Sequence, residues 1–349
     1  MDSTTNIRWF AHITLADRAM VGGKGGSLGE LERANVAVPP GFVVTTQGFE
    51  RLLAELEKEI PVRSRVEALS LQDLRGIRLI SEELRTRVKS APLPEDVCAD
   101  IVAAHEELCK PDLSCPLAVR SSATSEDSEE ASFAGLQDTY LWVKGAEAVL
   151  EYVRSCWASL YSVPSISYRL KDRTPENGVA IAVIIQKMVD ARSAGVMFTR
   201  SPLTGDRSVI TIESAWGLGS AVVSGEVTPD RFVIGKITSQ ISVRDISDKR
   251  IRHVPAESGG IKHTEMPEEL RRAPSISDEE LKALAEVGRK VERHYGRPQD
   301  IEWAIDQGGE IILLQSRPET VWSAKDKVPV ARPAENPLLH VMNIFGGRR

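Results

Sequence analysis

The sequence predicts an α+β protein with two lobes, and three observations support this prediction. Up to about residue 110, most segments have the apolar spacing of amphipathic helices. From Val179 onward, β-branched runs separated by Gly, Pro, Asp and Ser indicate a sheet-rich region. The length of 349 residues fits two domains at roughly 100–200 residues each. A cleft between two such lobes is a common ligand site.

Three regions are expected along the chain. Residues 1–178 would form an N-terminal lobe and residues 179–322 a C-terminal lobe. Residues 323–349 contain Pro, Lys and Arg without periodicity, which is typical of a linker or a docking tail.

In the N-terminal lobe, helices are expected over Gln47–Glu59 and Glu95–Lys110. Pro116–Arg120 has the composition of a short buried strand and leads into a polar loop, SSATSEDSEEASFAG. A further helix is predicted over Ala146–Tyr161, interrupted near Pro164.

In the C-terminal lobe, one helix begins at Ser277, which has a glutamate, Glu280, at the capping-box position, and it ends before Gly296. The segments DIEWAI and EIILLQSR, joined by DQGG, predict a β-hairpin. Four further strands are expected in the runs VAIAVIIQKMV, SAGVMFT, SVITIES and RFVIGK.

Composition excludes several classes of function. The 44 Lys and Arg against 50 Asp and Glu give a net charge of −6, and aromatic residues make up only 5%, so we expect no nucleic-acid partner. No apolar run approaches the ~20 residues that span a bilayer, and the start lacks a signal-peptide core. We therefore expect no membrane partner and a cytoplasmic location.

The four cysteines show no CxxC spacing. His105 and Cys109 lie four residues apart on an expected helix, with Cys98 and Cys115 flanking them, which permits a metal site. The sequence favours small buried thiols in a reducing compartment, and it implies no disulfide framework.

The glycine-rich segment VGGKGGSLG, residues 21–29, leads directly into an expected helix at Glu30–Ala34. Glycines around Lys24 let the backbone approach an anion, and a helix N-terminus directs free N–H groups at it. Lys24 would add a point charge. The alternative is a flexible turn before a helix.

Arg120 stands at the end of the predicted buried strand. Its planar guanidinium suits phosphate, beside a loop rich in hydroxyl groups. Gly135 permits close backbone approach, and Thr139 is suited to contact a phosphate or a metal-bound water. The alternative is an acidic surface loop in which Arg120 pairs with a carboxylate.

The C-terminal hairpin carries polar side chains on one face. With the turn centred on 307–308, Glu302 would pair with Leu313, while Gln315 would lie diagonally on the face of Glu302 and Asp300, with Arg317 continuing it. Hard oxygen ligands suit Mg²⁺, and a neighbouring arginine suits metal-bound phosphate. The opposite face would hold Ile301, Trp303, Ile312 and Leu314. The alternative is a half-exposed hairpin with a salt bridge.

Two further residues are candidates for ligand contact. Gln186 lies late in a buried strand, where its carboxamide needs a partner such as a nucleotide or the backbone. Glu213 opens a glycine-containing segment that would form either a loop over the cleft or ordinary turns.

Taken together, these segments resemble the ATP-binding domain of the phosphoenolpyruvate synthase and pyruvate phosphate dikinase family, which includes rifampicin phosphotransferases. The resemblance extends from about Val21 to Thr320, in family order. The matching blocks are VGGKGGSLGEL, VPPGFVVTTQGF, AVRSSATSEDSEEASFAG, QKMVDARSAGVMFTRSP, ESAWGLGSAVVSGEVTPDRF and DIEWAIDQGGEIILLQSRPET.

The resemblance implies an ATP-grasp fold with ATP between the lobes. Lys24, Arg120 and Arg317 would hold the triphosphate and stabilise its charge during transfer. Glu302 and Gln315 would ligate Mg²⁺, with Asp300 in support. The residues implied to contact the nucleotide are Gly135, Thr139, Gln186 and Glu213.

The resemblance also implies a phosphotransferase that cleaves Mg-ATP to AMP and passes phosphoryl to a histidine of a partner subunit or domain, for delivery to a small acceptor. The chain carries no phosphohistidine domain of its own, so it is similar to the separate ATP-binding subunit of phenylphosphate synthase. Two alternatives are a nucleotide-binding sensor without transfer, and an ATP-binding fragment of a phosphoenolpyruvate synthase or rifampicin phosphotransferase.

Overall fold

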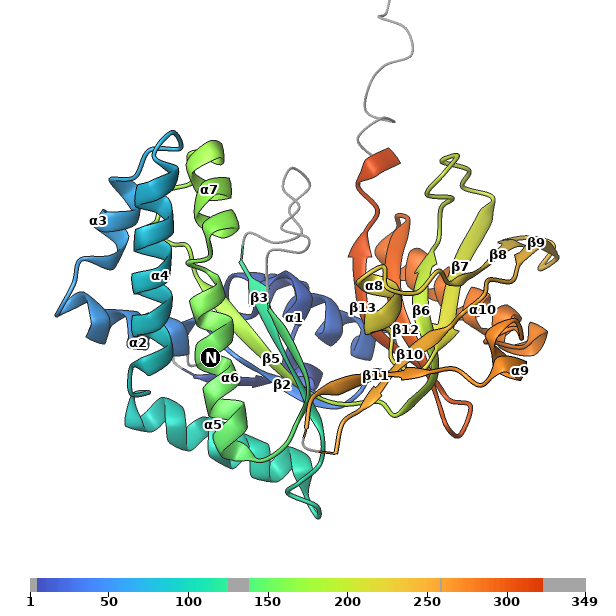
Figure 1. The fold of residues 1–349 in the computed structure, drawn as a ribbon, viewed down its shortest axis with the longest axis horizontal. Coiled ribbons are helices and arrows are strands. Elements are labelled where there is room, and N and C mark those ends of the chain that lie inside the picture. The colour runs from blue at the N-terminus through green and yellow to red at the C-terminus, as the bar shows by residue number, and fades with distance from the viewer. Residues whose placement is uncertain (1–4, 125–137, 258, 323–349) are drawn as a thin grey trace, which may run out of the picture.

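A computed structural model describes residues 5–124, 138–257 and 259–322 of the chain, and it has two lobes, each built on its own sheet (Figure 1). The expected α+β class with two lobes is therefore confirmed. Gly135 and the predicted tail, 323–349, lie outside the described residues.

The first lobe contains a five-stranded antiparallel sheet in the order β1-β2-β5-β3-β4. Three of its strands, β2, β3 and β5, are buried on both faces because helices cover both sides of the sheet. The bounds are β1 Ile7–Trp9, β2 Gly41–Val44, β3 Leu117–Ala123, β4 Thr139–Val143 and β5 Ile181–Lys187.

Helices cover one face of this sheet, and their core includes Phe49, Ile101 and Trp157 packed against Val183 and Ile185 of β5. These helices are α2 Thr46–Glu57, α3 Val62–Glu67, α4 Leu74–Ser90, α5 Glu95–Cys109, α6 Ala146–Ser159 and α7 Val163–Asp172.

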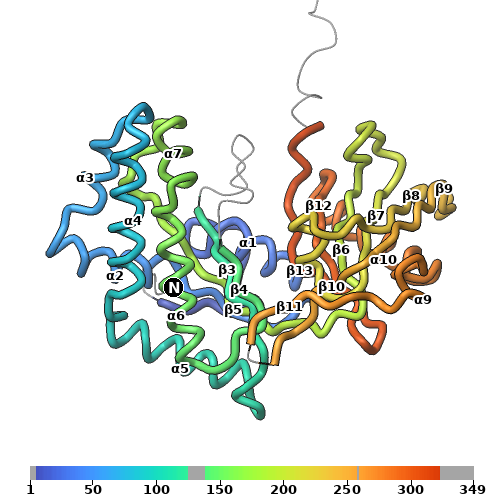
Figure 2. The backbone as a smooth tube through the Cα atoms, in the orientation of Figure 1, coloured from blue at the N-terminus to red at the C-terminus, as the bar shows by residue number. Residues whose placement is uncertain are grey.

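Helix α1, Arg18–Arg33, covers the opposite face and lies between the first sheet and the second lobe (Figure 2). Its Val21 and Leu28 pack against Ala182 and Ile184 of β5. Its Leu31 instead belongs to the core of the second lobe. The helix thus contributes side chains to the cores of both lobes. Two short 3₁₀ helices, η1 Phe10–His12 and η2 Leu15–Asp17, precede it.

The second lobe contains a six-stranded antiparallel sheet in the order β13-β12-β6-β7-β8-β9. The bounds are β6 Ala191–Phe198, β7 Val209–Trp216, β8 Asp230–Gly235, β9 Ile241–Asp245, β12 Gln299–Asp306 and β13 Ile311–Pro318.

Helix α10, Asp278–Tyr295, packs on this sheet through Leu281, Leu284 and Val291. The predicted capping box at Ser277 and Glu280 is confirmed, and so is the end of the helix at Gly296, which has a left-handed conformation.

Short elements complete the second lobe. They are α8 Ser220–Val223, α9 Glu268–Arg271 and a two-stranded ribbon of β10 Ile251–Pro255 and β11 Ile261–Glu265. The ribbon reaches the first lobe, where the backbone N–H of Gly260 donates to the carbonyl of Trp142, 3.2 Å away.

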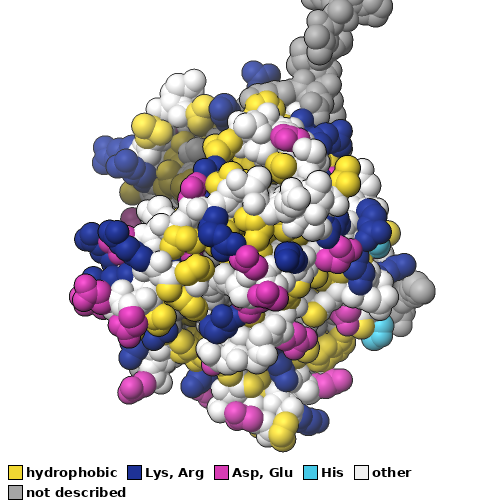
Figure 3. Space-filling model, turned by 90° about the vertical axis from the view of Figure 1, so that its right-hand side faces the viewer, with side chains coloured by type: hydrophobic (Ala, Val, Ile, Leu, Met, Phe, Trp, Pro, Cys, Tyr) yellow, Lys and Arg dark blue, Asp and Glu magenta, His cyan; other side chains and the backbone are white. Residues whose placement is uncertain are grey.

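On the face of the second lobe that Figure 3 presents, basic and acidic side chains are interspersed. Within the described residues, no helix has both the length and the apolar character needed to cross a bilayer.

Three local expectations differ from the structure. Strand β5 pairs with β2 and β3, so the strand that follows the predicted boundary at 178/179 belongs to the first sheet. The segment predicted as a loop around Lys24 is helical and is broken only at Gly22. Strands β1 and β2 were not expected, because they are short.

The expectation about the cysteines was wrong for Cys109 and Cys115. Cys109 and Cys115 form a disulfide, since the turn after α5 brings their Cα atoms to 5.6 Å. This pairing leaves no thiolate at Cys109 for the alternative metal site beside His105. Cys156 is a free, buried cysteine as expected, and Cys98 is free but partly exposed.

We predict that Gly22→Ala destabilises the chain by more than about 2 kcal/mol. Gly22 has φ +72°, and an added Cβ would lie 2.2 Å from the carbonyl oxygen of Ser122. The control is Gly225→Ala, where φ is +74° but nothing lies within 4 Å, so only backbone strain of about 1 kcal/mol is expected. Urea unfolding measures the stability of both variants. Equal losses of stability in the two variants would mean that the close contact of Gly22 with Ser122 does not hold α1 against β3.

Candidate functional site

Lys24 lies near the start of the helical segment that follows the break at Gly22. Ser122 of β3 fixes this segment, because its hydroxyl donates to the carbonyl of Val21 (2.9 Å) and accepts from the N–H of Gly25 (3.2 Å). The Lys24 ammonium donates to the carbonyl of Ser121, 3.2 Å away. A helix N-terminus and a cation are thereby held beside the end of β3.

Arg120 of β3 connects the two lobes. Its Nη1 donates to the carbonyl of Leu314 (2.9 Å), and its Nη2 donates to Gln315 Oε1 (2.6 Å) and Glu302 Oε2 (3.2 Å). The residue is buried, and its guanidinium reaches from the first sheet to β12 and β13 of the second. Two of these three acceptors belong to Glu302 and Gln315, the side chains that the resemblance assigns to Mg²⁺.

The hairpin register differs from the expectation. Glu302 lies directly opposite Gln315, and Asp300 lies opposite Arg317, because a β-bulge shifts the register between Glu302 and Trp303. The turn also contains one residue more than expected, with Gly309 at φ +87°.

The four polar residues of the hairpin therefore form two direct cross-strand pairs rather than diagonal ones. On the other face, Leu313 rather than Ile312 and Leu314 packs with Ile301 and Trp303.

The sheet register extends the row of polar positions. Glu302 lies opposite Val196 of β6, which lies opposite Glu213 of β7, and Glu213 lies opposite Arg231 of β8. Directly opposed residues point to the same face, so Glu213 and Glu302 share a face of the second sheet.

Burial raises the pKa values of two carboxyl groups that flank Glu302, those of Asp300 and Glu213. Desolvation raises the pKa of Asp300, although the Arg317 guanidinium, with Nε 2.8 Å from Asp300 Oδ2, opposes the shift. Desolvation also raises the pKa of Glu213, against the attraction of Arg231 and together with repulsion from Asp300. Both carboxylates would be stabilised by an additional cation on this face.

A cavity of about 500 Å³ lies between the lobes. Arg120, Thr139 and Gln186 line it from the first lobe, and Glu302 lines it from the second. Its apolar lining includes Met188, Val189, Ala191, Ala194, Leu218, Ala304 and Leu314. This volume and this mixture of apolar and polar groups are typical of a small-molecule site.

Gln186 is almost fully buried, and its Nε2 donates to the carbonyl of Pro39, 3.1 Å away. The backbone partner that the sequence offered as an alternative is thus present, while the residue also lines the cavity. Thr139 is exposed and lies directly opposite Arg120 in the sheet.

The structure brings most of the candidate residues into one region but not onto one surface. Arg120, Thr139, Gln186 and Glu302 line the cavity, and Gln315 joins them through Arg120. The other described candidates lie beyond this lining. They are Lys24, Glu213, Asp300 and Arg317.

Sequence reasoning missed Met188 and Val189 as parts of the cavity wall, whereas the loop over the cleft that it offered for the glycine-containing segment is present. Met188 and Val189 directly follow β5, and Leu218, Gly219 and Ser220 come from the glycine-containing segment after β7. The glycines of that segment indicated the loop, and Gly219 lines the cavity.

Two sheets, an apolar cavity between them and cationic and carboxylate groups at its border are features typical of a protein that binds small molecules. The chain belongs to the family described as pyruvate phosphate dikinase, AMP/ATP-binding domain, whose model matches residues 18–336. The ATP-grasp fold that the resemblance implied accords with this membership.

Curated relatives agree with this family. The chain is 43% identical over 318 residues to a probable phosphoenolpyruvate synthase of Methanothermobacter thermautotrophicus, a match that covers 90% of this chain and 46% of the relative. It is 40% identical over 309 residues to a rifampicin phosphotransferase of a Streptomyces species, a match that covers 88% of this chain and 35% of the relative. It is 36% identical over 355 residues to the phosphoenolpyruvate synthase of Pyrococcus furiosus, a match that covers 90% of this chain and 44% of the relative. The chain thus spans less than half the length of these relatives.

We predict that Glu213→Gln gains stability relative to the wild type as pH rises. The pKa of Glu213 in the folded chain is raised above the value of about 4.3 in the unfolded chain. Between these two pKa values the folded chain therefore binds more protons than the unfolded chain. The contribution of Glu213 to stability falls as pH rises through that window. Glutamine lacks this titration, while Arg231 keeps Asp245 as a partner.

The measurement is the urea midpoint of both chains from pH 4 to pH 7. Glu310→Gln, an exposed position in the hairpin turn, controls for the loss of one negative charge. A wild-type and Glu213→Gln difference that does not change with pH would contradict the assigned environment of Glu213.

Proposed function

We propose that this chain binds Mg-ATP between its lobes and is the ATP-cleaving part of a dikinase-type phosphotransferase. One observation carries the proposal: the Arg120 guanidinium, from the first lobe, bridges the carboxylate of Glu302 and the carboxamide oxygen of Gln315 beside the cavity. Family membership supports the nucleotide as the ligand.

The apolar part of the cavity suits the nucleoside. Met188, Val189 and Leu218 offer apolar contacts for a planar base, and Gln186 offers a buried amide for a polar edge. The cavity volume of about 500 Å³ is within the range of small-molecule sites.

The donor set fits a magnesium ion. Glu302 and Gln315 are paired across the hairpin, and both oxygens already contact a positive charge, that of Arg120. Their hard oxygens are the ligand type that Mg²⁺ prefers, with Asp300 one row further along the same strand. Bound there, the ion would neutralise phosphate charge.

Ligand binding would then change the partner of Arg120. With a cation on Glu302 and Gln315, the guanidinium is released to pair with phosphate oxygens, for which its planar fork is suited. Arg317 and Lys24 would add positive charge, and the helix N-terminus near Gly22 would add backbone N–H groups. Thr139 and Gly135, the latter outside the described residues, complete the proposed phosphate contacts.

The proposed reaction transfers phosphoryl to a histidine outside the two lobes described here. An imidazole nitrogen of a partner domain or subunit attacks the β phosphorus, the bond to the α-phosphate oxygen breaks, and AMP leaves. The γ phosphoryl group is released to water as phosphate. The role of this chain is to position the triphosphate and stabilise its charge. The relatives' greater length supports a partner domain.

The final acceptor is a small molecule: pyruvate, a phenol-type compound or a rifamycin-type compound, in line with the relatives' names and the resemblance. A fragment of a longer phosphoenolpyruvate synthase or rifampicin phosphotransferase would show the same ATP chemistry. The cytoplasmic location stays a prediction. A sensor without transfer is disfavoured, because it would not need both the phosphate and the metal groups.

We predict that Arg317→Lys binds Mg-ATP within a few-fold of the wild type but transfers phosphoryl about tenfold more slowly or worse. Lysine keeps the charge next to Asp300 but not the planar fork. Calorimetric titration measures binding, and AMP release in the presence of a histidine-bearing partner measures transfer. Unchanged transfer would contradict the role given to Arg317.

We predict that Glu302→Ala loses most of the gain in ATP affinity that Mg²⁺ confers. The measurement compares ATP binding with magnesium and with a chelator. Glu310→Ala is the matched control, since it removes an exposed carboxylate from the turn of the same hairpin. If both variants respond to magnesium as the wild type does, the hairpin is not the metal site.

A further inference from the structure

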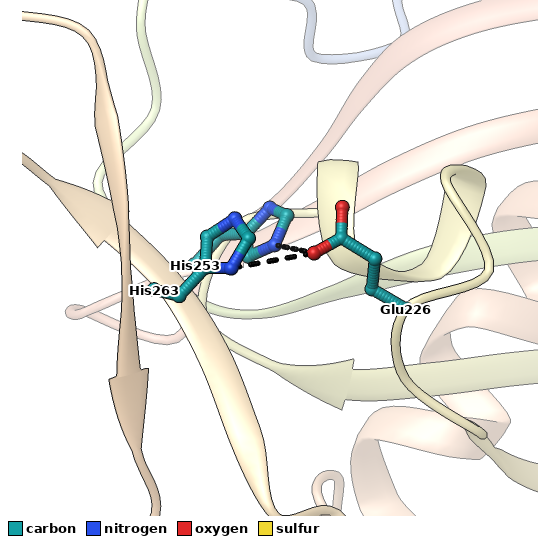
Figure 4. A group of neighbouring side chains, drawn as sticks. All are labelled: Glu226, His253 and His263. Atoms are coloured by element: carbon teal, nitrogen blue, oxygen red, sulfur yellow. Dashed lines mark ion pairs between the residues drawn. The ribbon is translucent and has the colours of Figure 1, made fainter.

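A second cluster of metal-ligating side chains lies on the ribbon of the second lobe. His253 of β10 and His263 of β11 are directly opposed across the ribbon, and Glu226, shortly after α8, faces both rings (Figure 4). None of these residues belongs to the hairpin that carries Glu302.

The distances suit a tetrahedral ion. Glu226 Oε2 lies 3.4 Å from His253 Nε2 and 3.3 Å from His263 Nδ1, and the ligand atoms of all three residues lie within 4.8 Å of one another. Zinc bonds of about 2.0–2.2 Å in tetrahedral geometry separate neighbouring ligand atoms by roughly 3.3–3.5 Å.

His253 carries the independent observation. Its side chain is 2% exposed, and its buried Nε2 makes no hydrogen bond of good geometry among the described residues, its contact being the long one of 3.4 Å to Glu226 Oε2. Its Nδ1 lies 2.8 Å from the hydroxyl of Ser220. When Nδ1–H donates to Ser220, Nε2 keeps a lone pair that faces Glu226, the arrangement found in histidine ligands whose second nitrogen is held by a neighbour.

Glu226 is suited to serve as an anionic ligand. Its carboxylate faces both imidazole rings, and Oε2 lies 3.4 Å from His253 Nε2 and 3.3 Å from His263 Nδ1. Two imidazoles and one carboxylate favour a borderline transition metal over magnesium, which prefers oxygen ligands alone.

We propose that Glu226, His253 and His263 form a zinc site, with water as the fourth ligand. The two rings are stacked, with centroids 4.3 Å apart and planes at 11°. Ring lone pairs lie in the ring plane, so the His263 ring must rotate to face the ion. Its side chain is 54% exposed and has the room to do so.

The proposed site would brace a wall of the cavity between the lobes. The carbonyl of His253 accepts from the N–H of Leu218 (3.0 Å), and Ser220, the partner of its ring, lines the cavity. The tip of the same ribbon reaches Trp142 in the first lobe. An ion here would fix the ribbon to α8 whether or not ATP is cleaved.

The test is zinc binding by the full chain, without nucleotide and with excess Mg²⁺, in competition with a chromophoric chelator. We expect His263→Asn to lose one bound zinc per chain. The matched control is His294→Asn, which removes an exposed histidine that also pairs with a glutamate, His294 Nε2 being 2.7 Å from Glu30. That variant should bind as the wild type does.

Thermal melting gives a second readout. Zinc should raise the melting temperature of the wild type and of His294→Asn but not of His263→Asn or Glu226→Gln. His263 and Glu226 are exposed enough that both variants are expected to fold, which circular dichroism checks. Equal zinc binding by the wild type and by His263→Asn would overturn the proposal, and the cluster would then be an ordinary histidine–carboxylate pair.

Discussion

The structure depends on one side chain, Arg120, which carries a buried positive charge from the first sheet into the second. Burying a guanidinium is costly unless its donors are satisfied. The acceptors on the hairpin, Glu302, Gln315 and the carbonyl of Leu314, supply this compensation. The position of the hairpin relative to β3 is therefore coupled to the charge state of the site.

Helix α1 adds a second connection between the lobes, and it is mainly apolar. Val21 and Leu28 pack under the first sheet, whereas Leu31 packs in the core of the second lobe. Because α1 anchors both cores, a change in the pairing of Arg120 can be made without separating the lobes. The break at Gly22 places a helix N-terminus and Lys24 at the same border.

Two carboxylates of the second sheet are buried at a free-energy cost that a bound cation would offset. Burial raises the pKa of both Asp300 and Glu213, so each carboxylate is less favourable in this fold than in water. Arg317 and Arg231 compensate in part. This imbalance is what the proposed magnesium site would relieve.

Much of the fold and of the candidate site could be predicted from local sequence patterns. Most of the remainder depends on pairing between segments that are far apart in the sequence. The capping box at Ser277 and the hairpin around the DQGG turn follow from local spacing. The bulge beside Glu302 does not, because a one-residue shift leaves the alternation on either side intact.

The partners of β5 depend on contacts that no local pattern specifies. Histidines 253 and 263 likewise meet only because β10 and β11 pair. The Cys109–Cys115 disulfide is local, at a sequence separation of 6, but its spacing matches no motif that the sequence analysis used.

The most direct measurement is to incubate the chain with Mg²⁺ and ATP labelled separately at the β and γ phosphates, with and without a histidine-bearing partner. The account predicts AMP only when the partner is present, with label from the β phosphate on its histidine. Tight ATP binding with no AMP and no labelled histidine under any partner would contradict phosphoryl transfer and identify the chain as a nucleotide sensor.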